Sequence, residues 1–171
     1  RQNMAVIFKP RVWFFLVALA CAGLIGFALY KQHMDFVDPC PLCVFQRIAF
    51  MCIGAVALVA ALHNPGTAGR WVYAGLVSLA GLTGMGIAAR HLWLQNLPPE
   101  LVPDCGMGLN YMLDTMPFSQ VLAEVFQGSG ECAEVMWTFL ALSMPAWTFV
   151  WYAGITVVTI LVVALANKSK V

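Results

Sequence analysis

Uncharged hydrophobic runs dominate the chain, and the four longest cover residues 12–30, 48–62, 71–89 and 146–166. A helix needs about 20 apolar residues to cross the hydrocarbon core of a bilayer, and three of the runs have about that length. The second run reaches it if its helix starts near Cys43 and carries Arg47 in its first turn. The pattern therefore predicts an all-α membrane protein, a four-transmembrane-helix bundle in a single integral-membrane domain. The predicted spans are about residues 12–30, 43–62, 71–89 and 146–166.

The composition agrees with this prediction and argues against some other classes of protein. Hydrophobic residues make up 61% of the 171 residues, and charged residues only 10%. About a quarter of the residues in a soluble domain are charged, so much of this surface must face lipid. The net charge of +1 gives no electrostatic reason to expect a nucleic acid as a partner.

The charged residues also predict the orientation of the bundle. An even number of spans puts both termini on one side of the membrane, together with the short segment 63–70. That side carries six basic residues and no acidic one: Arg1, Lys9, Arg11, Arg70, Lys168 and Lys170. All eight acidic residues lie on the other side. Because cytoplasmic segments are rich in Lys and Arg, we expect cytoplasmic termini, a short outer loop at about 31–42 and a long one at about 90–145.

The long outer loop contains the pattern of one further, short helix. Its apolar residues recur at helical spacing: Phe118, Val121, Leu122, Val125 and Phe126. Pro117 suits the first turn, Asp114 or Thr115 suits the cap before it, and Gly128 suits the end of the helix. The segment is too short to cross a bilayer. It either lies flat on the membrane surface or packs its apolar face on the ends of the other helices.

Six cysteines divide into two groups by their place in this topology. Cys21 and Cys52 lie inside transmembrane runs, and we interpret them as small buried hydrophobic residues. The remaining four belong to the outer side of the membrane: Cys40, Cys43, Cys105 and Cys132. Disulfides persist outside the reducing cytosol, so the placement of this second group suits thiol–disulfide chemistry.

Three interpretations compete for the four outer thiols. Two structural disulfides are one, but a bridge within Cys-x-x-Cys closes too small a ring to restrain much chain, and its geometry favours redox cycling. A four-cysteine zinc site is another, but Cys105 and Cys132 are too far apart in sequence for the usual paired spacing, so no metal is expected. The third, which we prefer, is an electron relay between two dithiol pairs.

Residues near Cys43 suggest where such a relay would deliver its electrons. A helix that starts there puts this sulfur at a helix N-terminus, which favours a thiolate, with Arg47 one turn deeper on the same face. Arg47 either snorkels to lipid phosphate or stabilises the thiolate and polarises an electron acceptor. An acceptor at this depth is lipid-soluble, and a quinone takes the two electrons that one dithiol releases. His91, beyond the third span, is either an interfacial residue or a donor to the quinone.

Two ordered motifs give the chain a resemblance to a known family. The first is Cys-Pro-Leu-Cys at 40–43, followed by Arg47. The second is Ser-Gly-Glu-Cys-Ala-Glu at 129–134, followed by Trp137, Phe-Leu at 139–140, Met-Pro at 144–145 and Trp147. With four spans and two outer cysteine pairs, this set resembles the bacterial DsbB family, the quinone-linked partners of the periplasmic oxidant DsbA. Gln46 departs from the Glu that family members often carry there, and Pro41 is also less usual.

The resemblance implies a quinone-dependent protein-thiol oxidase in the bacterial inner membrane, with its redox cysteines on the periplasmic side. It implies that a reduced DsbA-like protein attacks Cys105 and releases Cys132. Electrons then pass to the Cys40–Cys43 pair through a Cys40–Cys132 link. Cys43 delivers them to a membrane quinone, ubiquinone or menaquinone, in a pocket lined by Arg47 and His91. The alternatives are a disulfide-stapled scaffold without turnover and a quinone reductase of the vitamin K epoxide reductase type.

Overall fold

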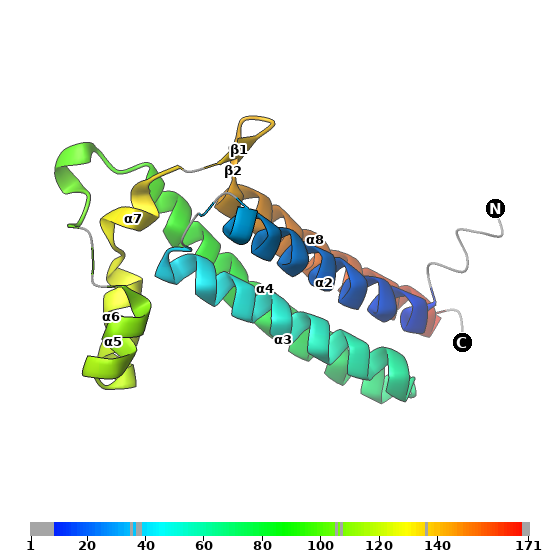
Figure 1. The fold of residues 1–171 in the computed structure, drawn as a ribbon. Helices are drawn as coiled ribbons and strands as arrows, with labels where there is room; N and C mark the ends of the chain where they lie inside the picture. The colour runs from blue at the N-terminus through cyan, green and yellow to red at the C-terminus, as the bar shows by residue number, and fades with distance from the viewer. Residues whose placement is uncertain are drawn as a thin grey trace.

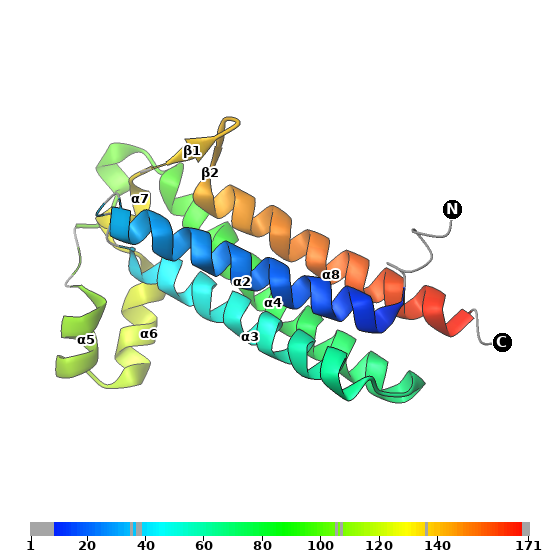
Figure 2. The same ribbon diagram turned by 45° about the vertical axis from the view of Figure 1, so that its right-hand side comes forward.

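A computed structural model describes residues 9–34, 36, 39–104, 106, 108–135 and 137–168. Within these residues, four helices are long and apolar enough to cross a membrane. They are α2 (Pro10–Met34), α3 (Pro41–His63), α4 (Thr67–Gln95) and α8 (Met144–Lys168). They run side by side as one bundle, and the described ends of the chain lie at the same end as the α3–α4 connection, opposite to the segments between α4 and α8 (Figures 1 and 2). The predicted four-helix membrane fold is confirmed.

The helices extend beyond the uncharged runs that predicted them. The third span was expected to end at about residue 89, but α4 continues to Gln95 and so carries His91 in a regular helical turn. The second was expected to start near Cys43, but α3 starts at Pro41 with Cys40 as its N-cap. Proline suits the first helical position because its fixed φ is helical and it lacks only an N–H that the helix does not use. Cys43 therefore lies within the first turn.

The middle of the bundle is held by close contact between α4 and α8. A Cβ atom on Gly84 would lie 2.5 Å from the Tyr152 ring, so only glycine allows this approach. Tyr152 is fully buried and stacks on Phe50 of α3, with 4.2 Å between the ring centroids. Its hydroxyl donates a hydrogen bond to the Gln46 carbonyl oxygen at 2.6 Å. Tyr152 thus ties three of the four long helices together directly beneath the cysteine motif of α3.

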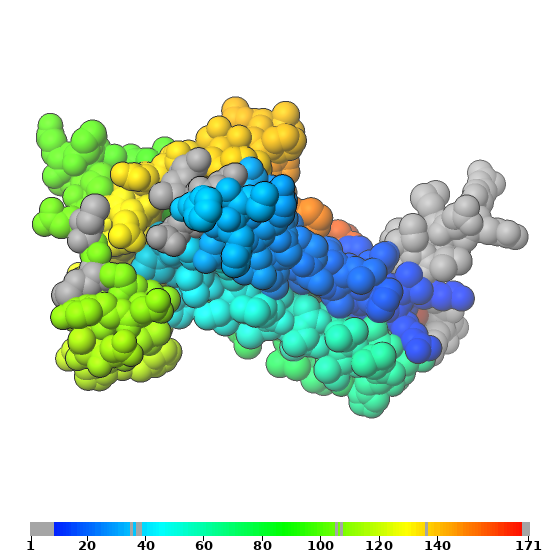
Figure 3. Space-filling model, in the orientation of Figure 1, coloured from blue at the N-terminus to red at the C-terminus, as the bar shows by residue number. Residues whose placement is uncertain are grey.

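Short elements cover the loop-bearing end of the bundle. In chain order they are η1 (Pro99–Leu101), α5 (Leu109–Thr115), α6 (Phe118–Gln127), α7 (Gly130–Ala133), β1 (Thr138–Phe139) and β2 (Leu142–Ser143). The two strands pair as an antiparallel hairpin. Helices α5 and α6 lie side by side and form a lobe at this end of the molecule (Figure 3).

The short helix predicted in the long loop is α6, with a different start from the one expected. Pro117 is its N-cap and does not lie in its first turn, while Thr115 ends the preceding helix α5. Val121 and Val125 are buried in a cluster with residues of α3 and α4, so this face packs on the bundle. Arg90 of α4 fixes the far end of α6, because its guanidinium donates hydrogen bonds to the carbonyl oxygens of Phe126 and Gln127 at 3.0 and 3.1 Å.

Candidate functional site

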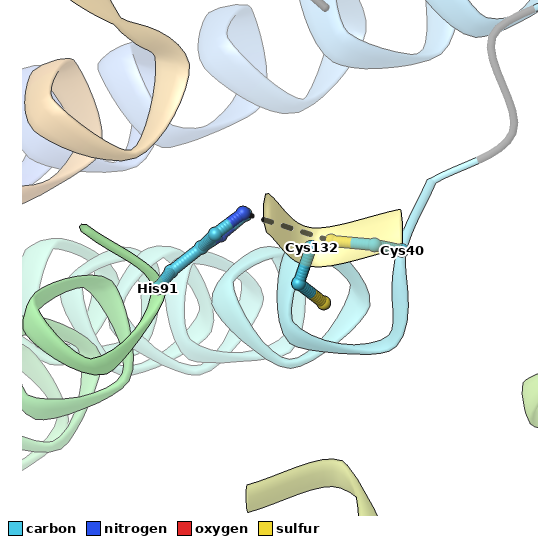
Figure 4. Close-up of side chains that lie close together, drawn as sticks. All are labelled: Cys40, His91 and Cys132. Carbon is cyan, nitrogen blue, oxygen red and sulfur yellow. Dashed lines mark hydrogen bonds between the residues drawn. The ribbon is translucent and has the colours of Figure 1, made fainter. Parts of the chain in front are cut away.

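Three buried side chains from three elements meet at the loop-bearing end of the bundle. Cys40 precedes α3, His91 belongs to the last turns of α4, and Cys132 belongs to α7. The two sulfurs and a ring nitrogen of His91 all lie within 4.8 Å of one another. Figure 4 shows the three side chains close together. The structure therefore brings together residues that are separated by 51 and 41 positions in the sequence.

Cys43 joins this cluster through Cys40. The two sulfurs of the Cys-x-x-Cys motif are 3.1 Å apart, well beyond the ~2.05 Å of a disulfide bond, so the pair is a dithiol. The Cys40 sulfur lies 3.8 Å from Nε2 of His91, and the Cys43 sulfur lies 4.0 Å from Nδ1 of the same ring. The imidazole thus contacts both sulfurs of the motif and can exchange a proton with either.

Cys132 is almost completely buried, and its surroundings favour the protonated thiol. The hydrogen bond with Cys40 raises its pKa well above the ordinary value, and burial raises it further. The hydroxyl of Ser129 lies 3.8 Å from the Cys132 sulfur and acts in the opposite direction, lowering this pKa. At neutral pH this sulfur is therefore held as a thiol next to a second thiol.

The fourth predicted redox residue, Cys105, lies outside the described residues. Its sequence neighbours nevertheless contact the turn before Cys132. The carbonyl oxygen of Asp104 accepts a hydrogen bond from the backbone N–H of Gly130 at 3.2 Å, and Gly106 packs against Ser129. The two parts of the long loop that carry the second predicted pair are therefore joined by described contacts.

Arg47 points toward α2 from the first turns of α3. Its guanidinium donates hydrogen bonds to the side-chain carbonyl of Gln32 at 2.6 Å and to the backbone carbonyl of Ala28 at 3.4 Å. It also lines a cavity of about 410 Å³ that Cys40, Cys43 and His91 share. The rest of the lining is largely apolar and aromatic: Phe27, Phe50, Trp137, Phe139, Trp147 and Trp151.

The loop side of this cavity is built by the small hairpin and the start of α8. Trp137 stacks on Phe139, and Trp147 donates a hydrogen bond from its indole nitrogen to the Phe139 carbonyl oxygen at 2.9 Å. Trp137 also makes an edge contact with Phe27 of α2. The tryptophans and Phe139 that the sequence showed only as parts of a motif therefore form one wall of the cavity.

Gln46 is the functional residue that sequence reasoning undervalued. Its side chain is buried, and its amide nitrogen lies 3.1 Å from Nδ1 of His91. Its amide oxygen accepts a hydrogen bond from the Thr148 hydroxyl at 2.9 Å. Because a buried amide between two partners cannot turn freely, Gln46 fixes the orientation of the imidazole beside the sulfurs. A polar residue immediately before Arg47, on an otherwise apolar helix, was the one signal in the sequence.

The two remaining cysteines lie away from this cluster and differ from each other. Cys21 is 1% exposed and packs inside the bundle, as expected. The expectation for Cys52 was wrong, because its side chain is exposed on the outer face of α3. Each helix of a four-helix bundle turns only part of its circumference inward, so an apolar residue within a span can face lipid as readily as protein.

Comparison with known proteins adds an independent finding. The family model "Disulfide bond formation protein DsbB" matches residues 10–162, a range that includes all the residues of the cluster. The chain is 51% identical over 166 residues to a Disulfide bond formation protein B of Chromobacterium violaceum, covering 97% of this chain and all of that protein. Similar proteins with the same name occur in Hahella chejuensis (55% identical, 86% and 90% covered) and Acinetobacter baylyi (50% identical, 83% and 85% covered).

Proposed function

The chain belongs to the DsbB family of disulfide bond formation proteins, and from that premise we propose that it is a quinone-dependent thiol oxidase that reoxidises a DsbA-like protein. Family membership itself gives a multi-pass membrane oxidoreductase that acts in disulfide bond formation. The observation that carries the finer proposal is the contact of Cys40, Cys43 and Cys132 beside one apolar cavity. At this place, thiols that can exchange lie next to a space that can take a lipid-soluble acceptor.

The first half of the proposed relay is thiol–disulfide exchange in the outer loop. A thiolate of the reduced partner attacks Cys105 of a Cys105–Cys132 disulfide, and Cys132 leaves with the bonding electrons. The second partner thiolate then attacks the mixed disulfide, so the partner leaves oxidised and the pair is left reduced. The contacts of Asp104 with Gly130 and of Gly106 with Ser129, which join the segments on either side of this pair, support the pairing.

In the second half, the Cys132 sulfur attacks Cys40 of a Cys40–Cys43 disulfide and releases Cys43 as a thiolate. Cys105 then attacks Cys132, which restores the outer disulfide and leaves Cys40 and Cys43 reduced. Two electrons and two protons have then reached the inner pair. The contact between the Cys40 and Cys132 sulfurs supports this step, because exchange requires the attacking sulfur to reach the disulfide directly.

The shared cavity fits a quinone as the final acceptor, which takes up two electrons and two protons from the Cys40–Cys43 dithiol. Its aromatic and aliphatic side chains suit an apolar ring, and polar groups such as Arg47 and His91 stand among them. Arg47 has guanidinium N–H groups to hold a quinone oxygen. His91 touches both sulfurs of the motif and is placed to carry a proton from them.

The distribution of charge supports an inner-membrane location with cytoplasmic termini and periplasmic cysteines. Among the described residues, the end of the bundle opposite to the cluster carries four basic residues and no acidic one: Lys9, Arg11, Arg70 and Lys168. The described acidic residues follow α4, on the side of the cluster. By the positive-inside rule, this asymmetry supports a location of the thiols in the oxidising compartment, where disulfides persist.

The test uses purified full-length protein in detergent, a short-chain quinone and a reduced DsbA-like protein. We expect one quinone reduced per two partner thiols lost, with Cys43→Ser abolishing both changes. Cys21→Ser and Cys52→Ser are matched controls that keep turnover. If thiols and quinone both stay unchanged with a second quinone and a second partner, while the disulfides remain intact, the proposal fails and a disulfide-stapled scaffold replaces it.

A further inference from the structure

The cluster of Cys40, Cys132 and His91 has the composition of a metal site as well as of a redox centre. Thiolate sulfur and imidazole nitrogen are the ligands that zinc prefers in proteins. All three residues are buried, and their ligand atoms lie within 4.8 Å of one another (Figure 4). We propose that the fully reduced chain binds one zinc ion through Cys40, Cys132 and Nε2 of His91, with Cys43 as the fourth ligand.

The distances between these atoms are close to those that tetrahedral zinc requires. Zinc–sulfur bonds of ~2.3 Å and zinc–nitrogen bonds of ~2.0 Å put neighbouring ligand atoms about 3.3–3.8 Å apart. The Cys40 sulfur and Nε2 of His91 are already 3.8 Å apart. The remaining separations within the trio are at most 4.8 Å, so an ion at their centre needs shifts of about an ångström or less.

Cys43 supplies the fourth ligand from the same helical turn as Cys40. Its sulfur lies 3.1 Å from that of Cys40 and 4.0 Å from Nδ1 of His91, so it must turn toward the Nε2 side of the ring to reach the ion. Two sulfurs from a Cys-x-x-Cys motif commonly form half of a tetrahedral zinc site. The spacing of Cys105 and Cys132 argued against four cysteines as ligands, but the fold brings His91 of α4 against the motif as a nitrogen ligand.

The hydrogen bonds around His91 also suit a metal ligand. When Nε2 binds an ion, Nδ1 keeps its proton and must donate it to a neighbour. The side-chain amide of Gln46 lies 3.1 Å from Nδ1 and accepts this proton when its oxygen faces the ring. The amide nitrogen then donates to the Thr148 hydroxyl, which itself donates to the Pro145 carbonyl oxygen at 2.8 Å. Every polar group in this series of hydrogen bonds, from His91 to Pro145, then keeps a partner.

Zinc binding and disulfide formation use the same sulfurs, so they exclude each other. A disulfide between any two of the three cysteines removes two ligands and leaves no tetrahedral set. Three thiolates and one Zn²⁺ carry a net charge of −1. A bound ion would prevent these thiols from taking part in thiol–disulfide exchange. Only this consequence of zinc binding rests on the proposed function.

The test measures metal on the full chain and needs neither quinone nor partner. Protein reduced with a phosphine is incubated with Zn²⁺, desalted and analysed for zinc, and a second sample is first oxidised with diamide. We expect about one zinc per reduced chain and less than a tenth of that in the oxidised chain. We also expect zinc to slow maleimide labelling of Cys132 at least tenfold, which reports the ion at this sulfur.

Substitutions distinguish this site from adventitious binding. His91→Ala and Cys132→Ser are expected to weaken zinc binding at least tenfold, whereas His63→Ala and Cys52→Ser, at exposed residues outside the cluster, leave it unchanged. Circular dichroism checks that each variant keeps its helices. The proposal is overturned if the reduced chain retains no zinc, if His91→Ala binds as tightly as the parent, or if the exposed-residue variants lose the metal. A chain that binds zinc yet reduces no quinone would contradict only the proposed function.

Discussion

The side-chain amide of Gln46 on α3 lies 3.1 Å from Nδ1 of His91 on α4, and the same amide accepts a hydrogen bond from Thr148 on α8. One glutamine thereby links the three helices around the cysteine cluster and sets the direction in which the imidazole presents its other nitrogen. That nitrogen, Nε2, lies 3.8 Å from the Cys40 sulfur.

Removing the amide should therefore slow the proton transfer that accompanies electron transfer. We expect Gln46→Ala to lower kcat with quinone about tenfold, since a buried histidine loses its partner, while the KM for the protein partner stays within twofold. Thr148→Val removes only the outer hydrogen bond and should cost about threefold. Because the two residues act in series, the double variant should be no slower than Gln46→Ala. Fully additive effects would show that Gln46 does not act through this network.

Arg47 should affect use of quinone more than docking of the partner. Its guanidinium is held by Gln32 and Ala28 of α2 at the wall of the cavity that we propose takes the quinone. We expect Arg47→Ala to raise the quinone KM about tenfold, because a charged hydrogen bond to a quinone oxygen is lost. Arg47→Lys keeps the charge and should recover part of the loss. A quinone KM equal to that of the parent in Arg47→Ala would remove this residue from the binding site.

The raised pKa of Cys132 has a direct consequence for its chemistry in the reduced protein. The hydrogen bond with Cys40, and then burial, keep the thiol protonated above its ordinary pKa of 9.0. Iodoacetamide reacts with the thiolate, so the pH at which labelling of Cys132 reaches half its maximal rate should lie above 9.0, the midpoint of an ordinary thiol. Cys40→Ala removes the largest cause and should lower this midpoint toward 9.0. Peptide mass spectrometry in a Cys105→Ser background measures both profiles, and a parent midpoint at or below 9.0 would contradict the assignment.

The same shift affects stability in a defined direction. The folded reduced chain keeps a proton on Cys132 that the unfolded chain releases as pH passes 9.0. The stabilisation is complete below that pH and decreases as pH rises through the higher pKa of the folded state. Thermal unfolding in detergent should show a lower midpoint at pH 10 than at pH 8, and this difference should shrink in Cys132→Ser.

Gly84 should be intolerant of any side chain, because of the Tyr152 ring. Its Cβ position lies 2.5 Å from that ring, so Gly84→Ala forces α4 and α8 apart and is expected to cost about 1–3 kcal/mol. Gly86 lies two residues further on the same helix and has no neighbour within 4 Å of its Cβ position. Gly86→Ala should therefore be neutral or slightly stabilising. Equal melting temperatures for the two variants would contradict the described packing.

The sequence was sufficient for the parts of the fold that depend on local patterns. Hydrophobic runs identified the four long helices, and apolar spacing between Pro117 and Gly128 identified α6. The hairpin gave no such signal, because Leu140 and Ala141 in its turn adopt positive φ angles of 50° and 62° without being Gly, Asn or Asp. Tertiary contacts through Trp137 and Trp147 overrode the local preference there.

The residues of the site also differ in how far the sequence could predict them. Cys40, Cys43 and Cys132 were identified from spacing and topology, and the structure brings them together. The contacts of His91 and Gln46 could not be derived, because His91 lies 45 positions after Gln46 and Thr148 lies 102 positions after it. No local pattern encodes which face of α4 meets α3 and α8. The choice depends on glycines such as Gly84, whose role appears only once Tyr152 is placed against it.

The hydrogen bonds from Arg90 fix the end of α6 on α4, so only the short segment after α6 connects Cys132 to that fixed point. Cys132 lies five positions after Gln127, so this sulfur can move at most ~18 Å from its anchor on α4. Within such a volume its effective concentration at Cys40 is in the millimolar range or above. In the relay that we propose, exchange between these two sulfurs is therefore a unimolecular step whose rate does not depend on how much partner protein is present.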